Sequence, residues 1–162
     1  MSKLQARKER NLPSKFERVF AKCRERGYRL VAHAGEEGPA SYVADTIDLL
    51  KVDRVDHGGR CLDDPVLVQR LVERRIPLTV CPCSNVKFGV FSRMAEHNLK
   101  QMLDAGLMVT VNSDDPSYFG AYVNANYADA QAALGLTNDD LYRMARNSFE
   151  AAFLPETSTK SC

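Results

Sequence analysis

Three short apolar segments that each stop at polar, metal-competent side chains constrain the fold of this chain most. Residues 30–36 end in His33 and Glu36, residues 54–59 pass through His57, and residues 109–116 end in Asp114 and Asp115. Each segment then breaks into Gly or Pro. Side chains at the ends of several strands converge when those strands are parallel neighbours, as in an α/β barrel. The three segments therefore predict one active-site face.

Apolar periodicity predicts strands and helices in alternation along the chain. The expected strands are 29–33, 54–57, 77–81 and 107–111, and the expected helices are 14–26, 39–50, 63–75, 94–103, 124–134 and 137–153. Ser14 and Glu17 have the spacing of a capping box at the start of the first helix. Because helices separate the strands, we expect right-handed crossovers and a parallel α/β sheet.

The length of 162 residues indicates one domain. We expect a polar N-terminal segment at 1–13 as a candidate for disorder, a domain at 14–154 and a tail at 155–162. A closed parallel barrel needs eight strands, more than this chain supplies. The alternative is an open, doubly wound sheet with a glycine-rich phosphate loop. The Gly58-Gly59 pair lacks the spacing of such a loop.

The formal net charge of +1 gives no electrostatic reason to expect a nucleic acid or an anionic membrane as partner. The charged start of the chain does not resemble a signal peptide, and we expect a cytoplasmic protein. The 5 Cys form no C-x-x-C framework, so we expect them to be reduced and structural. Cys81-Pro82-Cys83 is interpreted as a strand end with small packing residues.

His33 and Glu36 are the first candidates for chemistry. A neutral imidazole at a strand end can bind zinc, and a carboxyl group beside a metal can move a proton. The small residues Ala34 and Gly35 allow the tight turn that brings Glu36 back over the site. The alternative is a core histidine followed by a solvated turn.

The remaining candidates carry similar alternatives. Adjacent carboxylates at Asp114 and Asp115 repel each other, so one is expected to bind metal while the other faces a ligand; the alternative is a helix N-cap before Pro. His57 is followed by glycines that permit close approach of a substrate, and its alternative is a packed histidine. For His97 we expect a surface or capping position and no catalytic role.

Four motifs together carry a specific resemblance. Residues 31–36, 56–58, 81–85 and 111–116 resemble, in order and spacing, the fifth- to eighth-strand motifs of the adenosine/adenine deaminase family of zinc hydrolases. The chain is similar to the C-terminal half of these proteins, so the resemblance implies strands five to eight of a (β/α)8 TIM-type barrel. Within the family the motifs resemble the bacterial and fungal-type adenine deaminases, with adenosine as the alternative substrate.

The resemblance also implies site roles and a cofactor. His33 and Asp114 would bind Zn2+, and Glu36 would donate a proton to a ring nitrogen of the purine. His57 would orient or deprotonate the attacking water, and Asp115 would hydrogen-bond the purine. The implied reaction converts adenine to hypoxanthine and ammonia, and the implied partner is a small-molecule purine.

One departure from the family pattern is large. The family supplies two more zinc ligands from a His-x-His on its first strand, and this sequence has no His before His33. We therefore expect the isolated chain to be inactive or weak, and to need a complementing N-terminal half. The second hypothesis is a non-catalytic remnant, or a half-barrel module that associates with itself.

Overall fold

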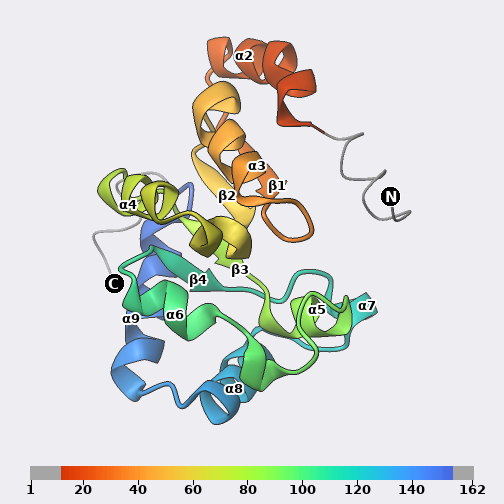
Figure 1. Ribbon diagram of the computed structural model, residues 1–162, viewed down its shortest axis with the longest axis vertical. Helices are drawn as coiled ribbons and strands as arrows, with labels where there is room; N and C mark the ends of the chain where they lie inside the picture. The colour runs from red at the N-terminus through yellow and green to blue at the C-terminus, as the bar shows by residue number, and fades with distance from the viewer. Residues whose placement is uncertain (1–11, 155–162) are drawn as a thin grey trace.

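Parallel strands alternate with helices in the computed structural model, which describes residues 12–154 (Figure 1). The strands are β1 (Val31–Ala34), β2 (Arg54–His57), β3 (Leu78–Val80) and β4 (Val109–Val111). The helices are α2 (Glu17–Glu25), α3 (Ala40–Asp45), α4 (Pro65–Glu73), α5 (Pro82–Lys87), α6 (Leu99–Asp104), α7 (Pro116–Phe119), α8 (Val123–Leu134) and α9 (Asn138–Glu150). Shorter helical turns are η1 (Pro13–Phe16), η2 (Thr46–Leu50), η3 (Gly59–Asp63) and η4 (Met94–Glu96). The expected segments 1–13 and 155–162 lie almost wholly outside the described residues.

The four strands form one parallel sheet in the order β1-β2-β3-β4, which is also their order in the sequence. The register pairs His33 with Asp56, Asp56 with Thr79, and Thr79 with Thr110. The carboxyl ends of the strands therefore lie at the same edge of the sheet. The predicted parallel α/β arrangement is confirmed.

One face of the sheet packs against the helices. Val55, Leu78 and Val109 are fully buried there and belong to the same core cluster as Leu71 of α4 and Met102 of α6. Side chains alternate between the two faces along a strand. The neighbouring positions on the other face therefore carry a polar row, namely His33, Asp56 and Thr79.

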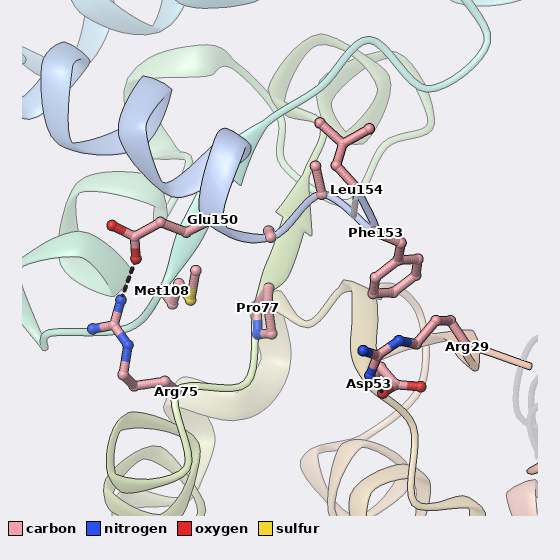
Figure 2. A pocket seen from close by; sticks show the side chains of 10 residues that line it. Arg29, Asp53, Arg75, Pro77, Met108, Glu150, Phe153 and Leu154 are labelled. Carbon is pink, nitrogen blue, oxygen red and sulfur yellow. Dashed lines mark hydrogen bonds and ion pairs between the residues drawn. The ribbon is translucent and has the colours of Figure 1, made fainter. Parts of the chain in front are cut away.

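A cavity of about 370 Å³ lies at the amino ends of the strands, away from the candidate site (Figure 2). Arg75 and Glu150 form an ion pair of 2.6 Å across it. Arg29 pairs with Asp53 at 2.8 Å. The end of the described chain closes this side, because the guanidinium of Arg54 lies 4.6 Å from the ring centre of Phe153. The charged groups here are satisfied by one another, which is typical of the stabilising end of such a sheet.

Several expected elements differ from the structure. The expected helix at 94–103 is two pieces, η4 and α6, because the chain is extended at His97 between them. The first helix begins as the turn η1 at Pro13, and no side-chain cap forms, so the capping box is wrong. Helices α5 and α7 were not predicted, since each is short and begins at a Pro in the segment that follows a strand.

Within residues 12–154, none of the helices has the length and apolar character needed to cross a bilayer.

We predict that Leu71→Ala lowers the free energy of unfolding by about 2–5 kcal/mol, because Leu71 is fully buried under the sheet and its truncation leaves a cavity. Val66→Ala in the same helix is the control, since Val66 is 67% exposed and its loss should change stability by less than about 0.5 kcal/mol. Urea denaturation followed by circular dichroism measures both. Equal effects of the two substitutions would contradict the packing described above.

Candidate active site

A cavity of about 390 Å³ opens at the carboxyl ends of the strands. It is lined by residues of the four strands and of the segments that follow them, and by the first residue of α8, namely His33, Arg54, Asp56, His57, Thr79, Cys81, Asn112, Ser113, Asp114 and Val123. His33, His57 and Asp114, three of the predicted site residues, therefore share one cavity. Glu36 joins them through His57, since its Oε1 lies 3.4 Å from His57 Nδ1.

Two interlocked glycine turns place Glu36. Gly35 follows β1 with a φ of 70°, and a Cβ added to it would lie 2.5 Å from a methyl group of Val43. The neighbouring turn after β2 is joined to it, because Gly58 N–H donates to Ala34 O at 2.9 Å. Only glycine fits this close approach with a left-handed backbone. The turn directs Glu36 back over the strand ends, as the sequence predicts.

Two residues of the site adopt a backbone conformation that side chains rarely take. His57 has a φ of 67° and Asp114 a φ of 59°, and neither is glycine. Such conformations cost free energy and cluster at functional sites, where the surrounding structure maintains them. Each residue stands at or just after the end of its strand. The strain turns their side chains away from the regular alternation of the sheet.

Hydrogen bonds hold the polar side chains of the site in place. Ser84 Oγ donates to Asp114 Oδ2 at 2.6 Å. Thr79 Oγ1 donates to Asp56 Oδ1 at 2.6 Å, and the other oxygen of Asp56 lies 3.6 Å from His33 Nδ1. A carboxylate beside one imidazole nitrogen orients the ring and leaves the other nitrogen free to bind a metal. Asp56, Thr79 and Ser84 thus support the candidates, although no sequence periodicity marks them.

The two histidines differ in exposure. The side chain of His33 is 69% exposed, so the alternative of a buried core histidine is wrong for it. The side chain of His57 is only 4% exposed, as its packed alternative requires, but it also contacts Glu36. The ring centres of His33 and His57 are 5.1 Å apart.

Burial and negative charge shift the pKa values in the site. Desolvation, followed by the nearby carboxylate of Asp114, raises the pKa of Glu36 above its usual value. Burial also lowers the pKa of His57, so its ring is neutral at neutral pH. A carboxyl group that keeps its proton more readily is suited to act as an acid. A neutral imidazole beside it is suited to accept a proton.

The donor atoms present fit a zinc-like ion. The ligand atoms of His57, Cys81 and Asp114 all lie within 4.8 Å of one another, which is unique among groups of three or more such residues in the described range. Imidazole nitrogen, sulfur and carboxylate oxygen are the donors that zinc prefers. Cys81, predicted to be a packing residue, thus also lies beside two possible metal ligands. Burial, with added effects of Asp114 and Glu36, raises the pKa of its thiol to about 12.

Asp115 stands apart from this cavity. Its Oδ1 accepts hydrogen bonds from the backbone N–H groups of Ser117 and Tyr118, both at 3.1 Å. Asp115 therefore caps α7, which is the alternative that the Asp-Pro sequence left open.

Two further residues belong to the site and were missed as candidates. Asn85 Nδ2 donates to Glu36 Oε1 at 2.8 Å and lies 3.4 Å from His57 Nδ1. His97 Nε2 lies 3.1 Å from Asn85 Oδ1, and His97 Nδ1 accepts from Leu99 N–H at 3.0 Å. The capping position expected for His97 is confirmed, but the surface position is wrong, since His97 is only 4% exposed. Its polar sequence neighbours gave no signal of burial.

The fold is that of a parallel α/β protein with a cavity at the carboxyl ends of its strands, and comparison with known proteins identifies the family. The Adenosine deaminase family model matches residues 4–161. The chain therefore belongs to the adenosine deaminase family. It is 60% identical over 147 residues to the adenine deaminase of Geotalea uraniireducens, covering 90% of this chain and 41% of that protein. It is 59% identical to the adenine deaminase of Cupriavidus necator, with coverage of 90% and 41%.

Solved structures agree with the sequence comparison. The crystal structure of adenine deaminase from Arthrobacter aurescens superimposes with a TM-score of 0.90 at 47% identity, covering 93% of this chain and 46% of that one. An amidohydrolase from Burkholderia ambifaria with bound Zn superimposes with a TM-score of 0.83 at 29% identity, covering 90% and 41%. The chain thus spans about two-fifths of the length of the relatives it matches. The expected partial TIM-type barrel is confirmed.

Proposed function

We propose that this chain supplies the carboxyl-terminal half of the active site of a zinc-dependent adenine deaminase. The observation that carries the proposal is the meeting of Glu36, His57 and Asp114 at one edge of the sheet, in a chain 60% identical to adenine deaminases. The reaction consumes adenine and water and yields hypoxanthine and ammonia. Adenosine is the alternative substrate.

His33 and Asp114 are the proposed zinc ligands of this chain. Both line the cavity, and each is held by a hydrogen-bonding or charged neighbour, Asp56 for His33 and Ser84 for Asp114. When bound, zinc lowers the pKa of a coordinated water towards neutrality.

The chain's own residues supply the proton transfers. His57, neutral at neutral pH, orients the attacking water and accepts its proton as C6 of adenine is attacked. Glu36, whose pKa is raised, gives its proton to the ring nitrogen beside C6. The proton held by His57 then passes to the amino group, which leaves as ammonia, and the Glu36 carboxylate takes up the proton of the new C6 hydroxyl, so that both side chains return to their starting states. Asp115 is proposed to hydrogen-bond the purine through Oδ2, since the cap of α7 uses Oδ1.

A deaminase assay with a matched pair of variants tests the proposal. We expect little ammonia release from adenine by the chain alone with zinc, because the sequence has no His before His33 to complete the zinc site. We expect turnover when the chain is joined to the amino-terminal part of the Geotalea uraniireducens adenine deaminase. Glu36→Gln in the joined protein should lower kcat at least about 100-fold, since general acid catalysis contributes about 10²–10⁴-fold.

Glu37→Gln is the control, because Glu37 is the exposed neighbour of Glu36 and the charge change is the same. It should leave kcat within about twofold of the unchanged protein. Adenosine in parallel reactions decides between the two substrates. A joined, metal-loaded protein that deaminates neither purine would refute the proposed function, and robust turnover by the chain alone would refute its dependence on a second half.

We predict that Ser84→Ala weakens zinc binding by the chain about 10-fold or more, because it removes the hydrogen bond that fixes the Asp114 carboxylate. Ser117→Ala is the control, since Ser117 is an exposed serine of α7. Isothermal titration calorimetry with zinc measures both without any need for turnover. Equal affinities of the two variants would contradict this role of Ser84.

The same titration separates two ligand sets. If His33 and Asp114 hold the metal, then His33→Ala weakens binding and Cys81→Ser leaves it nearly unchanged. The reverse result would overturn the assignment of His33 and place the metal among His57, Cys81 and Asp114, whose donor atoms lie within 4.8 Å of one another.

A half-barrel that associates with itself is the second candidate function. Within the described residues β1 and β4 each pair with a strand on one side only, and Val31 of β1 is 37% exposed. Unpaired strand edges promote association. Light scattering on the purified chain should then show a dimer that Val31→Lys weakens, because a charge on an edge strand opposes pairing. A stable monomer at all concentrations would count against this candidate.

A further inference from the structure

We propose that His97 is a positioning residue that fixes the side-chain amide of Asn85, so that this amide donates to Glu36. The inference deepens the proposed function, on which the description of Glu36 as the acid rests. The contacts behind it involve the side chains of His97, Asn85 and Glu36 and the backbone N–H of Leu99.

The contacts of His97 decide which of its ring nitrogens carries the proton. Nδ1 is 3.0 Å from the backbone N–H of Leu99, which can only donate, so Nδ1 accepts. In a neutral ring the proton then resides on Nε2. Burial lowers the pKa of His97 to about 4, which keeps the ring neutral at neutral pH. His97 therefore presents one N–H, and it points at Asn85.

That single N–H sets the orientation of the Asn85 amide. His97 Nε2 lies 3.1 Å from Asn85 Oδ1, so the amide oxygen accepts there and the NH2 group must face the other way. On that side Asn85 Nδ2 donates to Glu36 Oε1 at 2.8 Å. In the reversed orientation an amide oxygen would face the Glu36 oxygen and an NH2 group would face the N–H of His97. Both contacts would be repulsive.

The geometry also explains why a histidine stands at this position. Its two nitrogens serve two partners at once, the start of α6 through Leu99 and the site through Asn85. The ring of Phe91 packs against it with 4.5 Å between the ring centres and restricts its motion. His97, just before α6, is thereby connected to Glu36 through Asn85. Asn85 and Glu36 are themselves 49 positions apart in the sequence.

Two variants separate the two partners of His97. Asparagine places its amide near the former Nδ1, so His97→Asn can still accept from Leu99 N–H but has no donor that reaches Asn85. Glutamine is longer and places its NH2 group near the former Nε2, so His97→Gln keeps the donor to Asn85. A merely structural cap of α6 would be preserved by Asn and lost with Gln. The proposed positioning role requires the opposite order.

Nuclear magnetic resonance on the chain provides the first measurement. Nitrogen shifts of the unchanged protein should show His97 protonated at Nε2 and unprotonated at Nδ1. The NH2 protons of Asn85 should exchange with water about tenfold faster in His97→Asn than in the unchanged protein, and at nearly the same rate in His97→Gln. A proton on Nδ1 would overturn the proposal even if neither variant folded, and so would faster exchange in His97→Gln alone.

The joined protein described above provides the second measurement. We expect His97→Asn to lower kcat about tenfold with little change in KM, because the acid is misplaced while purine binding is retained. His97→Gln should restore most of kcat. Failure of this inference is distinct from failure of the proposed function: a joined protein that deaminates adenine equally well with Asn or Gln at 97 refutes the positioning role alone.

Discussion

Parallel pairing in register is the constraint on which the site depends. His33, Asp56 and Thr79 are opposite one another across β1, β2 and β3, and most other residues of the cavity lie at or after the end of one of these strands or of β4. A slip of one residue would turn each side chain to the opposite face of the sheet. The buried apolar residues between them, such as Val55 and Leu78, prevent that slip, because it would expose the core. Apolar packing on one face of the sheet thus fixes the position of the polar side chains on the other face.

The same convergence concentrates negative charge. The carboxylate of Asp114 raises the pKa of Glu36, and it acts with Glu36 and Asp56 to raise that of Cys81, in each case after burial itself. Like charges held this close destabilise a fold unless hydrogen-bond donors or a cation compensate them. Ser84 and Asn85 compensate in part by donating to Asp114 and Glu36. The remaining charge is a physical reason for a divalent cation among these residues, independent of any similarity to other proteins.

Local sequence signals predicted the regular part of this molecule well. The strand at 54–57 has the predicted bounds, and Val55 within it is fully buried, since apolar β-branched residues favour a buried strand. Prediction failed where short segments leave a strand end, as at α5 and α7, because one or two turns are too short to show a period. It also failed at 94–103, where extended backbone at His97 divides the expected helix into η4 and α6.

The site residues that the sequence did not predict are those that depend on contacts between residues far apart in the chain. The strand ends marked His33, Glu36, His57 and Asp114 as candidates because each follows an apolar run. No local pattern reveals that Asn85 bridges Glu36 and His97, since the bridge forms only when α5 and the segments that carry Glu36 and His97 have come together. Residues that act through another side chain are selected by a partner's geometry rather than by their own segment. A sequence motif therefore points to candidate residues, and a structure is needed to find the residues that position them.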